Sequence, residues 1–363
     1  MFARTLLPLA LICLLFAVGC DMKETASRRE NLPKAKGAPG EILVVMDSLM
    51  WRGPVGAEIK KTFHDLVPGL PREEPMFNLN YVDPINFKSI LRTARNLLFV
   101  TVLDDTGRGN RRLKATFTDE SIAMIEEDPE LFMFGKRDQY AQGQNVLHLF
   151  GATSGELIKN IDTNRATLQQ YFEEIERRRT YDALYASRPE RGIERQLETI
   201  FGCRMSIPYG YAISMEHPGF IWLRNFSRDI DKNLILSYVP YTHTEQFGLD
   251  SLIAIRERIM KPYVLYKEDD PESFVITETY HMDVERGEIN LNGNYAVQLK
   301  GLWKLNKYTM GGPFVSYALA DPTTNRLYYI EGFFYGPGVA QREHMRELDT
   351  ILRTFNLSSR DPG

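Results

Sequence analysis

The pattern of apolar residues changes halfway along the chain, and this change limits the folds that the chain can adopt. Over residues 41–179, strand-like and helix-like segments alternate. The first is the apolar run at residues 42–46, typical of a strand covered on both faces, and Gly53 and Pro54 then open a helix. Such alternation predicts an α/β layer domain over residues 41–179, with a sheet that is at least partly parallel.

Local signals predict further elements within this first domain. Asp83 and Pro84 cap and open a helix that is expected to turn Phe87, Ile90, Leu91 and Ala94 inward. A strand follows at residues 96–103, a loop at residues 104–112 and a helix from about residue 119. A second buried strand, residues 145–150, leads into one long helix over residues 154–178, capped by Thr153 together with Glu156.

The sequence of the second half predicts an α+β domain over residues 193–356. A short helix is followed by strand-like runs, and the segment 321–325 is predicted to be a hairpin turn before a closing helix over residues 341–355. Runs of strands between helices predict an antiparallel sheet flanked by helices. Residues 180–192, with Pro189 and Gly192, are the expected linker, and residues 357–363 are expected to be a disordered tail. The expected strands are residues 211–215, 220–226, 234–238, 274–281, 295–304, 314–320 and 327–335.

The N-terminal residues carry the pattern of a bacterial lipoprotein signal. Arg4 precedes an apolar run over residues 6–18, which at about 13 residues is shorter than the ~20 needed to span a bilayer. The run ends at Gly19-Cys20, and Ala17-Val18-Gly19-Cys20 resembles the lipobox, although that motif usually carries Leu where this chain has Ala17. The resemblance implies cleavage of residues 1–19 as a signal peptide and lipidation of Cys20 with diacylglyceryl and N-acyl chains, a membrane anchor.

Residues 20–40 then read as a flexible tether between the lipid and the fold, because they are polar and carry Pro and Gly without periodicity. Asp21 is ambiguous. Directly after the lipidated cysteine it resembles an inner-membrane retention signal, whereas acidic residues just after that cysteine resemble a surface-export signal. We favour the outer membrane, on its periplasmic or surface face.

Composition excludes several classes of function. The chain is 43% hydrophobic and 11% aromatic, as expected for a packed globular protein, and its net charge of −4 comes with no long basic run. Nucleic acid is therefore not an expected partner. With Cys13 in the signal and Cys20 lipidated, Cys203 is left alone, and we interpret it as a buried, inert thiol.

Two resemblances can be stated on these residues. The order of elements over residues 193–356, with Ile207-Pro208 before the first strand, resembles a PsbP-like α/β/α sandwich. The chain as a whole resembles a Bacteroidota lipoprotein family catalogued as domain of unknown function 4837, through Lys136-Arg137-Asp138-Gln139-Tyr140-Ala141 with Gln144 and through residues 328–336. This family brings no known activity and so implies no functional residues.

No motif predicts a cofactor or a metal. The six histidines lie in different elements, and none has a second His or Cys two to four residues away. There is no nucleophile elbow, no phosphate-binding loop and no dinucleotide fingerprint after the first strand. Neither a cofactor nor a catalytic or metal site is therefore expected. The histidines are His64, His148, His217, His243, His281 and His344.

Four groups of residues remain as candidate binding features. Asp47, Asp104 and Asp105 follow strands, where parallel sheets place functional groups, and they form either a carboxylate cluster or ordinary caps. The loop with Arg108, Arg111 and Arg112 is either an anion site or a solvated turn. Residues 151–155 offer a helix N-terminus that ordinary capping explains. In the second half, strand alternation would leave one set of aromatic residues in the core and expose the other, as at Tyr328 against Tyr329, where it could bind a glycan, a peptide or a protein; core and cross-strand packing is expected to account for the larger part of them. The aromatic residues are Tyr209, Tyr211, Phe220, Trp222, Phe226, Tyr238, Tyr241, Trp303, Tyr308, Tyr317, Tyr328, Tyr329, Phe333, Phe334 and Tyr335.

These observations favour a membrane-anchored envelope lipoprotein with a non-enzymatic binding or assembly role. Its expected partners are the membrane, through the lipid on Cys20, and an envelope protein or a glycan. The alternative is an envelope hydrolase that acts on glycan or peptide with carboxylates near Asp47 and Asp104.

Overall fold

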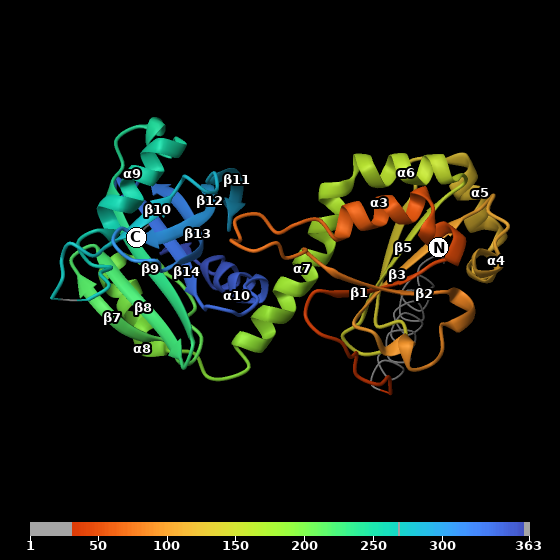
Figure 1. Ribbon diagram of the computed structural model, residues 1–363, viewed down its shortest axis with the longest axis horizontal. Coiled ribbons are helices and arrows are strands. Elements are labelled where there is room, and N and C mark those ends of the chain that lie inside the picture. The colour runs from red at the N-terminus through yellow and green to blue at the C-terminus, as the bar shows by residue number, and fades with distance from the viewer. Residues whose placement is uncertain (1–30, 268, 359–363) are drawn as a thin grey trace, which may run out of the picture. The chain divides into compact units, whose positions relative to one another are not determined.

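The computed structural model describes residues 31–267 and 269–358. The chain divides into two compact units (Figure 1). The N-terminal unit comprises Met1–Asp65 and Phe77–Phe172, and the C-terminal unit comprises Leu66–Met76 and Glu173–Gly363. The signal peptide, Cys20 and most of the expected tether lie outside the described residues.

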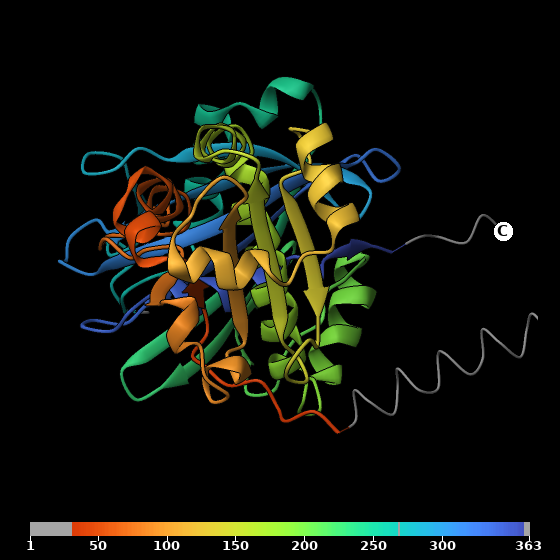
Figure 2. The same ribbon diagram turned by 90° about the vertical axis from the view of Figure 1, so that its right-hand side faces the viewer.

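A five-stranded sheet forms the centre of the N-terminal unit, in the order β2-β1-β3-β5-β4 (Figure 2). The first four strands in this order are parallel, and β4 pairs antiparallel with β5 at one edge. Every residue of β3 is buried, as expected for a largely apolar strand in a sheet covered on both faces. The predicted α/β class with a partly parallel sheet is confirmed. The strands are β1 (Glu41–Val45), β2 (Asn78–Val82), β3 (Asn96–Val102), β4 (Met133–Arg137) and β5 (Asn145–Gly151).

Helices cover both faces of this sheet. On one face, α4 inserts Leu113 beside Phe99, and α5 inserts Ile125 beside Phe150. Helices α3, α6 and the start of α7 form the other layer, where Phe63 and Phe172 meet edge to face at 5.6 Å. The helices are α2 (Ser48–Arg52), α3 (Pro54–Phe63), α4 (Arg108–Lys114), α5 (Asp119–Glu127), α6 (Ser154–Thr163) and α7 (Arg165–Leu184).

Three sequence predictions for this unit are wrong. The helix after Asp83 is replaced by two 3-10 turns, η1 (Pro84–Asn86) and η2 (Leu91–Thr93), and Ile90 is 79% exposed. The backbone at the end of this segment instead pairs with Lys36: the N–H of Lys36 donates to the carbonyl of Thr93, and its carbonyl accepts from the N–H of Arg95. The second half of the predicted loop over residues 104–112 belongs to helix α4, and the single long helix is broken at Asn164, the C-cap of α6.

The C-terminal unit is built on an eight-stranded antiparallel sheet, in the order β10-β12-β13-β14-β9-β8-β7, with β11 paired to β12. Asp321 accepts hydrogen bonds from Thr323 and Thr324 and so closes the predicted hairpin turn between β13 and β14. Strand β11 was not predicted, since its polar sequence lies largely exposed. The strands are β7 (Ala212–His217), β8 (Phe220–Ser227), β9 (Ile230–Pro240), β10 (Val275–Glu278), β11 (Glu285–Leu291), β12 (Asn294–Leu305), β13 (Gly311–Asp321) and β14 (Arg326–Tyr335).

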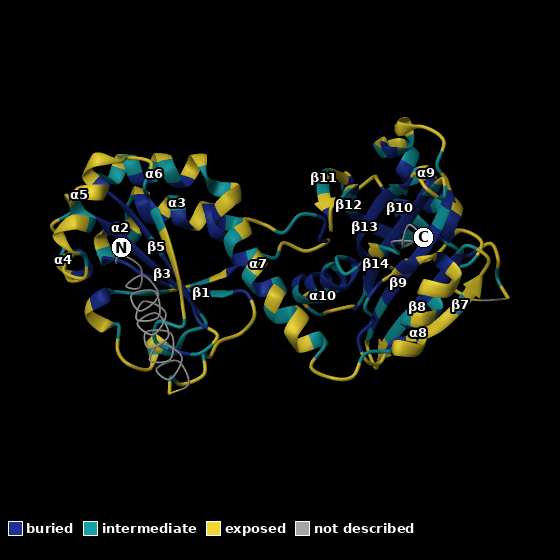
Figure 3. Ribbon diagram, turned by 180° about the vertical axis from the view of Figure 1, so that it is seen from behind, coloured by how far each residue is buried: buried dark blue, intermediate teal, exposed yellow. Residues whose placement is uncertain are grey.

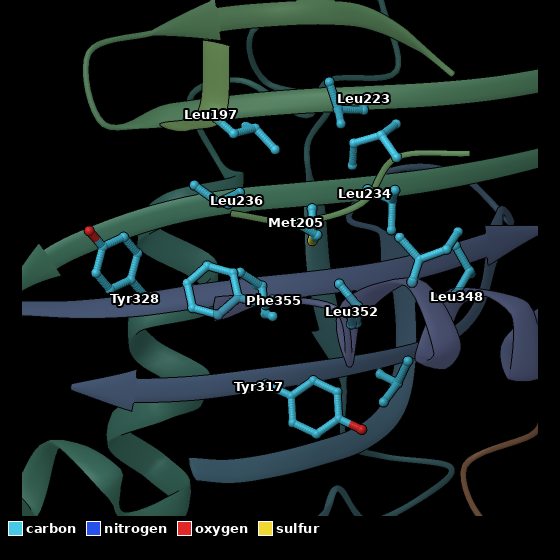
Figure 4. Packing of buried hydrophobic residues seen from close by; sticks show 14 of the residues in the cluster. Leu197, Met205, Leu223, Leu234, Leu236, Tyr317, Tyr328, Leu348, Leu352 and Phe355 are labelled. Atoms are coloured by element: carbon cyan, nitrogen blue, oxygen red, sulfur yellow. The ribbon is translucent and has the colours of Figure 1, made fainter. Parts of the chain in front are cut away.

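Each face of this sheet carries its own hydrophobic core. One core joins the sheet to α8 (Arg191–Gln196), the π-helical turn η3 (Leu197–Phe201) and α10 (Arg342–Leu352); Figure 4 shows Leu197, Tyr328 and Leu348 within it. The other core joins the sheet to α9 (Leu249–Met260), which follows the 3-10 turn η4 (Thr244–Phe247). Strands β9, β13 and β14 are therefore buried along most of their length (Figure 3). The predicted antiparallel sheet flanked by helices is confirmed.

The end of the chain adds a second, two-stranded sheet to this unit. After η3, Gly202 adopts a left-handed conformation with φ of 70°, and β6 (Cys203–Arg204) pairs with β15 (Asn356–Leu357). Leu357 thus belongs to a strand, although the sequence predicted a disordered tail from residue 357.

The division between the units also differs from the predicted linker at residues 180–192. It falls after Phe172, within α7, because the second half of this helix pairs with α10: Glu173 bonds Arg346 at 3.0 Å. The segment Leu66–Met76 also belongs to the C-terminal unit, where Leu70 is 6% exposed within the core that contains α10.

The segment Leu66–Met76 caps α10 from outside the helix. The carboxylate of Glu74 accepts hydrogen bonds from the backbone N–H groups of Gln341 at 2.6 Å and Arg342 at 3.0 Å. The side chain of Gln341, at the N-cap position, makes no capping bond. Glu74 therefore supplies both the acceptor and the negative charge that a helix N-terminus favours.

We expect Glu74→Ala to lower the free energy of unfolding of the C-terminal unit by about 1 to 2 kcal/mol, because two helix N–H groups lose their acceptor. Glu74→Gln, which keeps an acceptor oxygen, should lose less. Urea unfolding measures both. The matched control is Glu73→Ala, which removes an exposed carboxylate one residue away and should change stability by less than about 0.5 kcal/mol. Equal losses for both alanine variants would contradict the capping role.

Candidate functional site

The structure brings two of the three candidate carboxylates together. Asp47 follows β1 and is 4% exposed, and Asp105 follows β3. A Cβ atom placed on Gly107 would lie 2.7 Å from Asp47 Oδ2 and 2.8 Å from Asp105 Oδ1, so both carboxylates converge on this glycine. Asp104 is exposed, and its backbone N–H donates to the carbonyl of Ala152.

Backbone donors occupy these carboxylates. Asp47 Oδ1 accepts from Leu49 N at 2.9 Å and Oδ2 from Gly109 N at 2.8 Å, and Asp105 Oδ1 accepts from Gly107 N at 2.7 Å. Asp83, after β2, accepts in the same way from Ser48 and Ile85. The carboxylates thus cap and join the loops at the carboxyl ends of three strands. The alternative hypothesis, a hydrolase that uses carboxylates near Asp47 and Asp104, stays a prediction.

The arginines of the expected loop lie on a helix. Arg108, Arg111 and Arg112 are exposed on α4, a helix of seven residues, so the prediction of a flexible loop is wrong. The helix forms because Asp47 and Asp105 accept the N–H groups of Gly109 and Gly107 at its start. The contact with Asp105 is local in sequence, whereas Asp47 lies 62 residues before Gly109.

At the start of α6, the predicted cap is present. Thr153 Oγ1 accepts from the backbone N–H of Glu156 at 3.3 Å, as expected for ordinary capping.

Most aromatic residues of the second half are core residues. Tyr328 and Tyr329 point to opposite faces of β14, yet both are fully buried, because helices cover both faces. The favoured expectation of core and cross-strand packing is therefore confirmed, and the alternative, an exposed alternating set on β14, is wrong. Tyr209, at 70% exposure, lies before β7, and Phe226, at 67% exposure, lies near the end of β8.

The titratable groups show no metal-binding arrangement in the described parts of the chain, where no group of three or more His, Cys, Asp or Glu side chains could hold an ion. Cys203 is fully buried, and burial raises the pKa of its thiol to about 12, which agrees with an inert thiol. His148 stacks on Phe99 at 4.9 Å, and burial, followed by the charge of Lys136, lowers its pKa to about 4.

A groove of about 580 Å³ lies within the C-terminal unit and was not predicted. Its walls come from five segments: the second half of α7, Ser206 after β6, the end of β11 with the turn that follows it, the end of α10, and β15. Three guanidinium groups line it, from Arg177, Arg178 and Arg353, together with one carboxylate, Glu174. Tyr181, which is 43% exposed, stands beside them.

Asp349, which does not line the groove, contacts two of the arginines that do. Arg353 Nε donates to Asp349 Oδ2 at 2.8 Å, and Arg177 Nη1 lies 3.9 Å from the same oxygen. The phenol of Tyr317 donates to the other oxygen. Burial raises the pKa of Asp349, but the opposite effect of Arg353 and Tyr317 is larger. The pKa of Asp349 therefore lies below its usual value.

Arg178 differs from the other two arginines. Arg177 pairs with Glu174, and Arg353 with Asp349. Arg178 is exposed, and no carboxylate of the described residues pairs with it. Three guanidinium groups against the carboxylates of Glu174 and Asp349 leave one net positive charge, so the groove favours an anionic group. The sequence signal was the run Arg177-Arg178-Arg179; the remaining walls are assembled only by tertiary folding.

A helix that crosses a bilayer must be about 20 residues long and predominantly apolar. No helix among the described residues meets both requirements.

Comparison with known families assigns each half of the chain to a domain of unknown function. Residues 190–354 match the family model "Domain of unknown function (DUF4837)", and residues 35–185 match a second model, "Domain of unknown function (DUF8532)". The resemblance to the first family is confirmed over the C-terminal half, while Lys136 to Gln144 fall within the second model. No curated protein matches the chain.

Several solved structures are distantly similar. The Ran-binding protein Mog1p of Saccharomyces cerevisiae is 11% identical, and the alignment covers 43% of this chain and 90% of that one with a TM-score of 0.28. Human STARD10 is 10% identical, with 46% and 81% covered and a TM-score of 0.21. The lipid transfer and protein localization domain of human StarD13 is 10% identical, with 44% and 95% covered and a TM-score of 0.20.

His148 should make the stability of the N-terminal unit depend on pH. Its pKa is about 4 in the folded chain, against an ordinary value of 6.5, so the unfolded chain binds the proton first. Stability is therefore complete above about pH 6.5 and falls, by up to about 3 kcal/mol, as the pH approaches 4. Denaturant unfolding followed by Trp51 fluorescence at pH 7 and pH 4.5 measures the difference.

His148→Gln should remove most of this pH dependence, whereas His243→Gln, at an exposed histidine of the other unit, should leave it as in the wild type. A slope that survives in the His148 variant would show that other groups cause it.

Proposed function

We propose that this chain, whose residues 190–354 match the model of the DUF4837 family of unknown function, is a membrane-anchored envelope lipoprotein that acts by binding. The anchor rests on the sequence of residues 1–20, where Arg4, the apolar run and Gly19-Cys20 form a lipoprotein signal. Two or three acyl chains on Cys20 would hold the chain on a membrane, because one chain alone binds reversibly. We place the anchor in the outer membrane.

The ligand site of this proposal is the groove of the C-terminal unit. The observation that carries it is the set of three guanidinium groups, Arg177, Arg178 and Arg353, on one groove of about 580 Å³. Grooves of this size hold small ligands or a few units of a polymer. Ion pairs fix Arg177 and Arg353 in position, so little side-chain entropy is lost when a ligand binds them.

An anionic glycan fits this groove best among the partners that the sequence suggested. The guanidinium groups can hold carboxylate or phosphate substituents with paired hydrogen bonds. Tyr181, a partly exposed aromatic residue, offers a flat surface for a sugar ring, and Asn290 and Asn292 add amide groups at the wall. Binding should weaken as salt is added, because part of the attraction is between charges.

Lipidation is tested directly by growing cells that express the chain with an alkyne-labelled fatty acid. We expect the chain to become labelled and to stay in the membrane fraction, and Cys20→Ser to lose the label and the processed form. Cys203→Ser is the matched control and should be labelled like the wild type. An unlabelled wild-type chain would contradict the anchor.

Glycan binding is tested with a charged and a neutral oligosaccharide, a hexamer of galacturonate and one of maltose, by calorimetry. We expect only the charged hexamer to bind, and Arg178→Glu to weaken it by about tenfold or more, the loss of one charge-assisted hydrogen bond.

Arg188→Glu makes the same change of charge at an exposed arginine that does not line the groove, and should alter the affinity less than twofold. Equal binding of both hexamers, or equal effects of the two variants, would overturn the assignment of this groove.

A further inference from the structure

A second cavity, of about 440 Å³, lies within the N-terminal unit. It is bounded by α5, by strands β4 and β5 and by the turn that follows β4. Phe134 of β4 faces His148 of β5 across the strand pair, with ring centroids 6.4 Å apart, and Phe150 continues the same wall. The opposite wall includes Met124 and Ile125 of α5.

The cavity exists because short helices leave part of the sheet uncovered. Helix α4 has seven residues and α5 has nine, and each covers its own cluster on the sheet. Phe134 and Met124 therefore remain 58% exposed beside the cavity. Large apolar side chains gathered around a cavity of this size are typical of a site for an apolar ligand.

Gln139 adds an unpaired acceptor to this apolar wall. Its Nε2 donates to Tyr140 Oη at 2.8 Å, but its Oε1 is buried and accepts no hydrogen bond within the described parts of the chain. A buried acceptor without a donor is unfavourable, and such groups in folded proteins usually meet a donor from water or a ligand.

Lys136 adds a positive charge to the same cavity. It is exposed, and no carboxylate among residues 31–267 and 269–358 forms an ion pair with it. Its ammonium lies close enough to His148 to lower the pKa of the imidazole, after the larger effect of burial. An anionic group of a ligand can therefore pair with Lys136 while the rest of the ligand lies against Phe134 and Phe150.

We propose that this cavity binds a free hydroxylated fatty acid. The aliphatic chain lies between α5 and the β4–β5 pair, the carboxylate pairs with Lys136, and the hydroxyl donates to Gln139 Oε1. Each part of the ligand thus matches one feature of the wall. The site is separate from the groove of the C-terminal unit, and its existence does not depend on that groove.

The test uses the full chain in lipid nanodiscs and dodecanoate that carries a photoreactive diazirine. After illumination, mass spectrometry locates the adducts. We expect them between residues 116 and 150, with 3-hydroxydodecanoate competing three- to tenfold better than dodecanoate because of one added hydrogen bond. 1-Dodecanol, without the charge, should compete about tenfold less well than dodecanoate.

Three variants test which residue of the cavity contacts each part of the ligand. Lys136→Glu should reduce labelling about tenfold, and Met124→Glu, at the exposed side of the cavity, should reduce it similarly. Gln139→Leu should remove the advantage of the hydroxylated competitor and leave labelling by dodecanoate in place. Lys159→Glu, the same change at an exposed lysine that does not line the cavity, is the control and should label like the wild type. Melting curves confirm that each variant folds.

Several outcomes would overturn the proposal: adducts spread over the chain, labelling unchanged by Lys136→Glu, or 1-dodecanol competing as well as dodecanoate. A photoreactive phospholipid that labels the same residues, without competition from 3-hydroxydodecanoate, would also overturn it, because the occupant would then be a membrane lipid rather than a free acid.

Discussion

The C-terminal unit depends on one buried ion pair between a helix and the sheet. Arg256 of α9 and Glu331 of β14 are fully buried, and two hydrogen bonds of 2.8 Å join them, from Nε and from Nη2. Burial lowers the pKa of Arg256, but Glu331 raises it above its ordinary value, so the guanidinium stays charged. Arg256 Nη1 donates to Thr277, the phenol of Tyr329 also donates to Glu331 Oε2, and the ring centroid of Phe314 lies 4.3 Å from the guanidinium carbon. Removing either charge alone would therefore lower the free energy of unfolding strongly, because the other charge would stay buried without a partner.

This pair explains why the aromatic residues of the sheet offer little surface. Because α9 is held on one face and α10 packs on the other, alternating positions of β14 are buried on both sides. The two proposed binding sites therefore lie at the margins of the two sheets, where helices end or leave gaps. The groove forms at the end of α10, and the cavity forms beside the short helix α5.

Short sequence motifs correctly predicted the caps and turns that depend only on neighbouring residues. The cap at Thr153 and the turn at Asp321 need only neighbours in the chain, and both are present. The apolar runs likewise predicted the class of both domains. Glu331 is a charged residue in an apolar strand, which signals a buried partner, but nothing near it in the sequence indicates Arg256, 75 residues away. The groove was missed for the same reason, since its arginines come from α7 and from the end of α10.

The most direct test is a double-mutant cycle on this pair, with Arg256→Met, Glu331→Leu and the combined variant, measured by denaturant unfolding. The account predicts that each single variant loses about 3 to 5 kcal/mol, because it leaves one charge buried alone. The combined variant should lose far less than the sum, since neither charge remains. Losses below about 1 kcal/mol that simply add, as for an exposed pair, would contradict it.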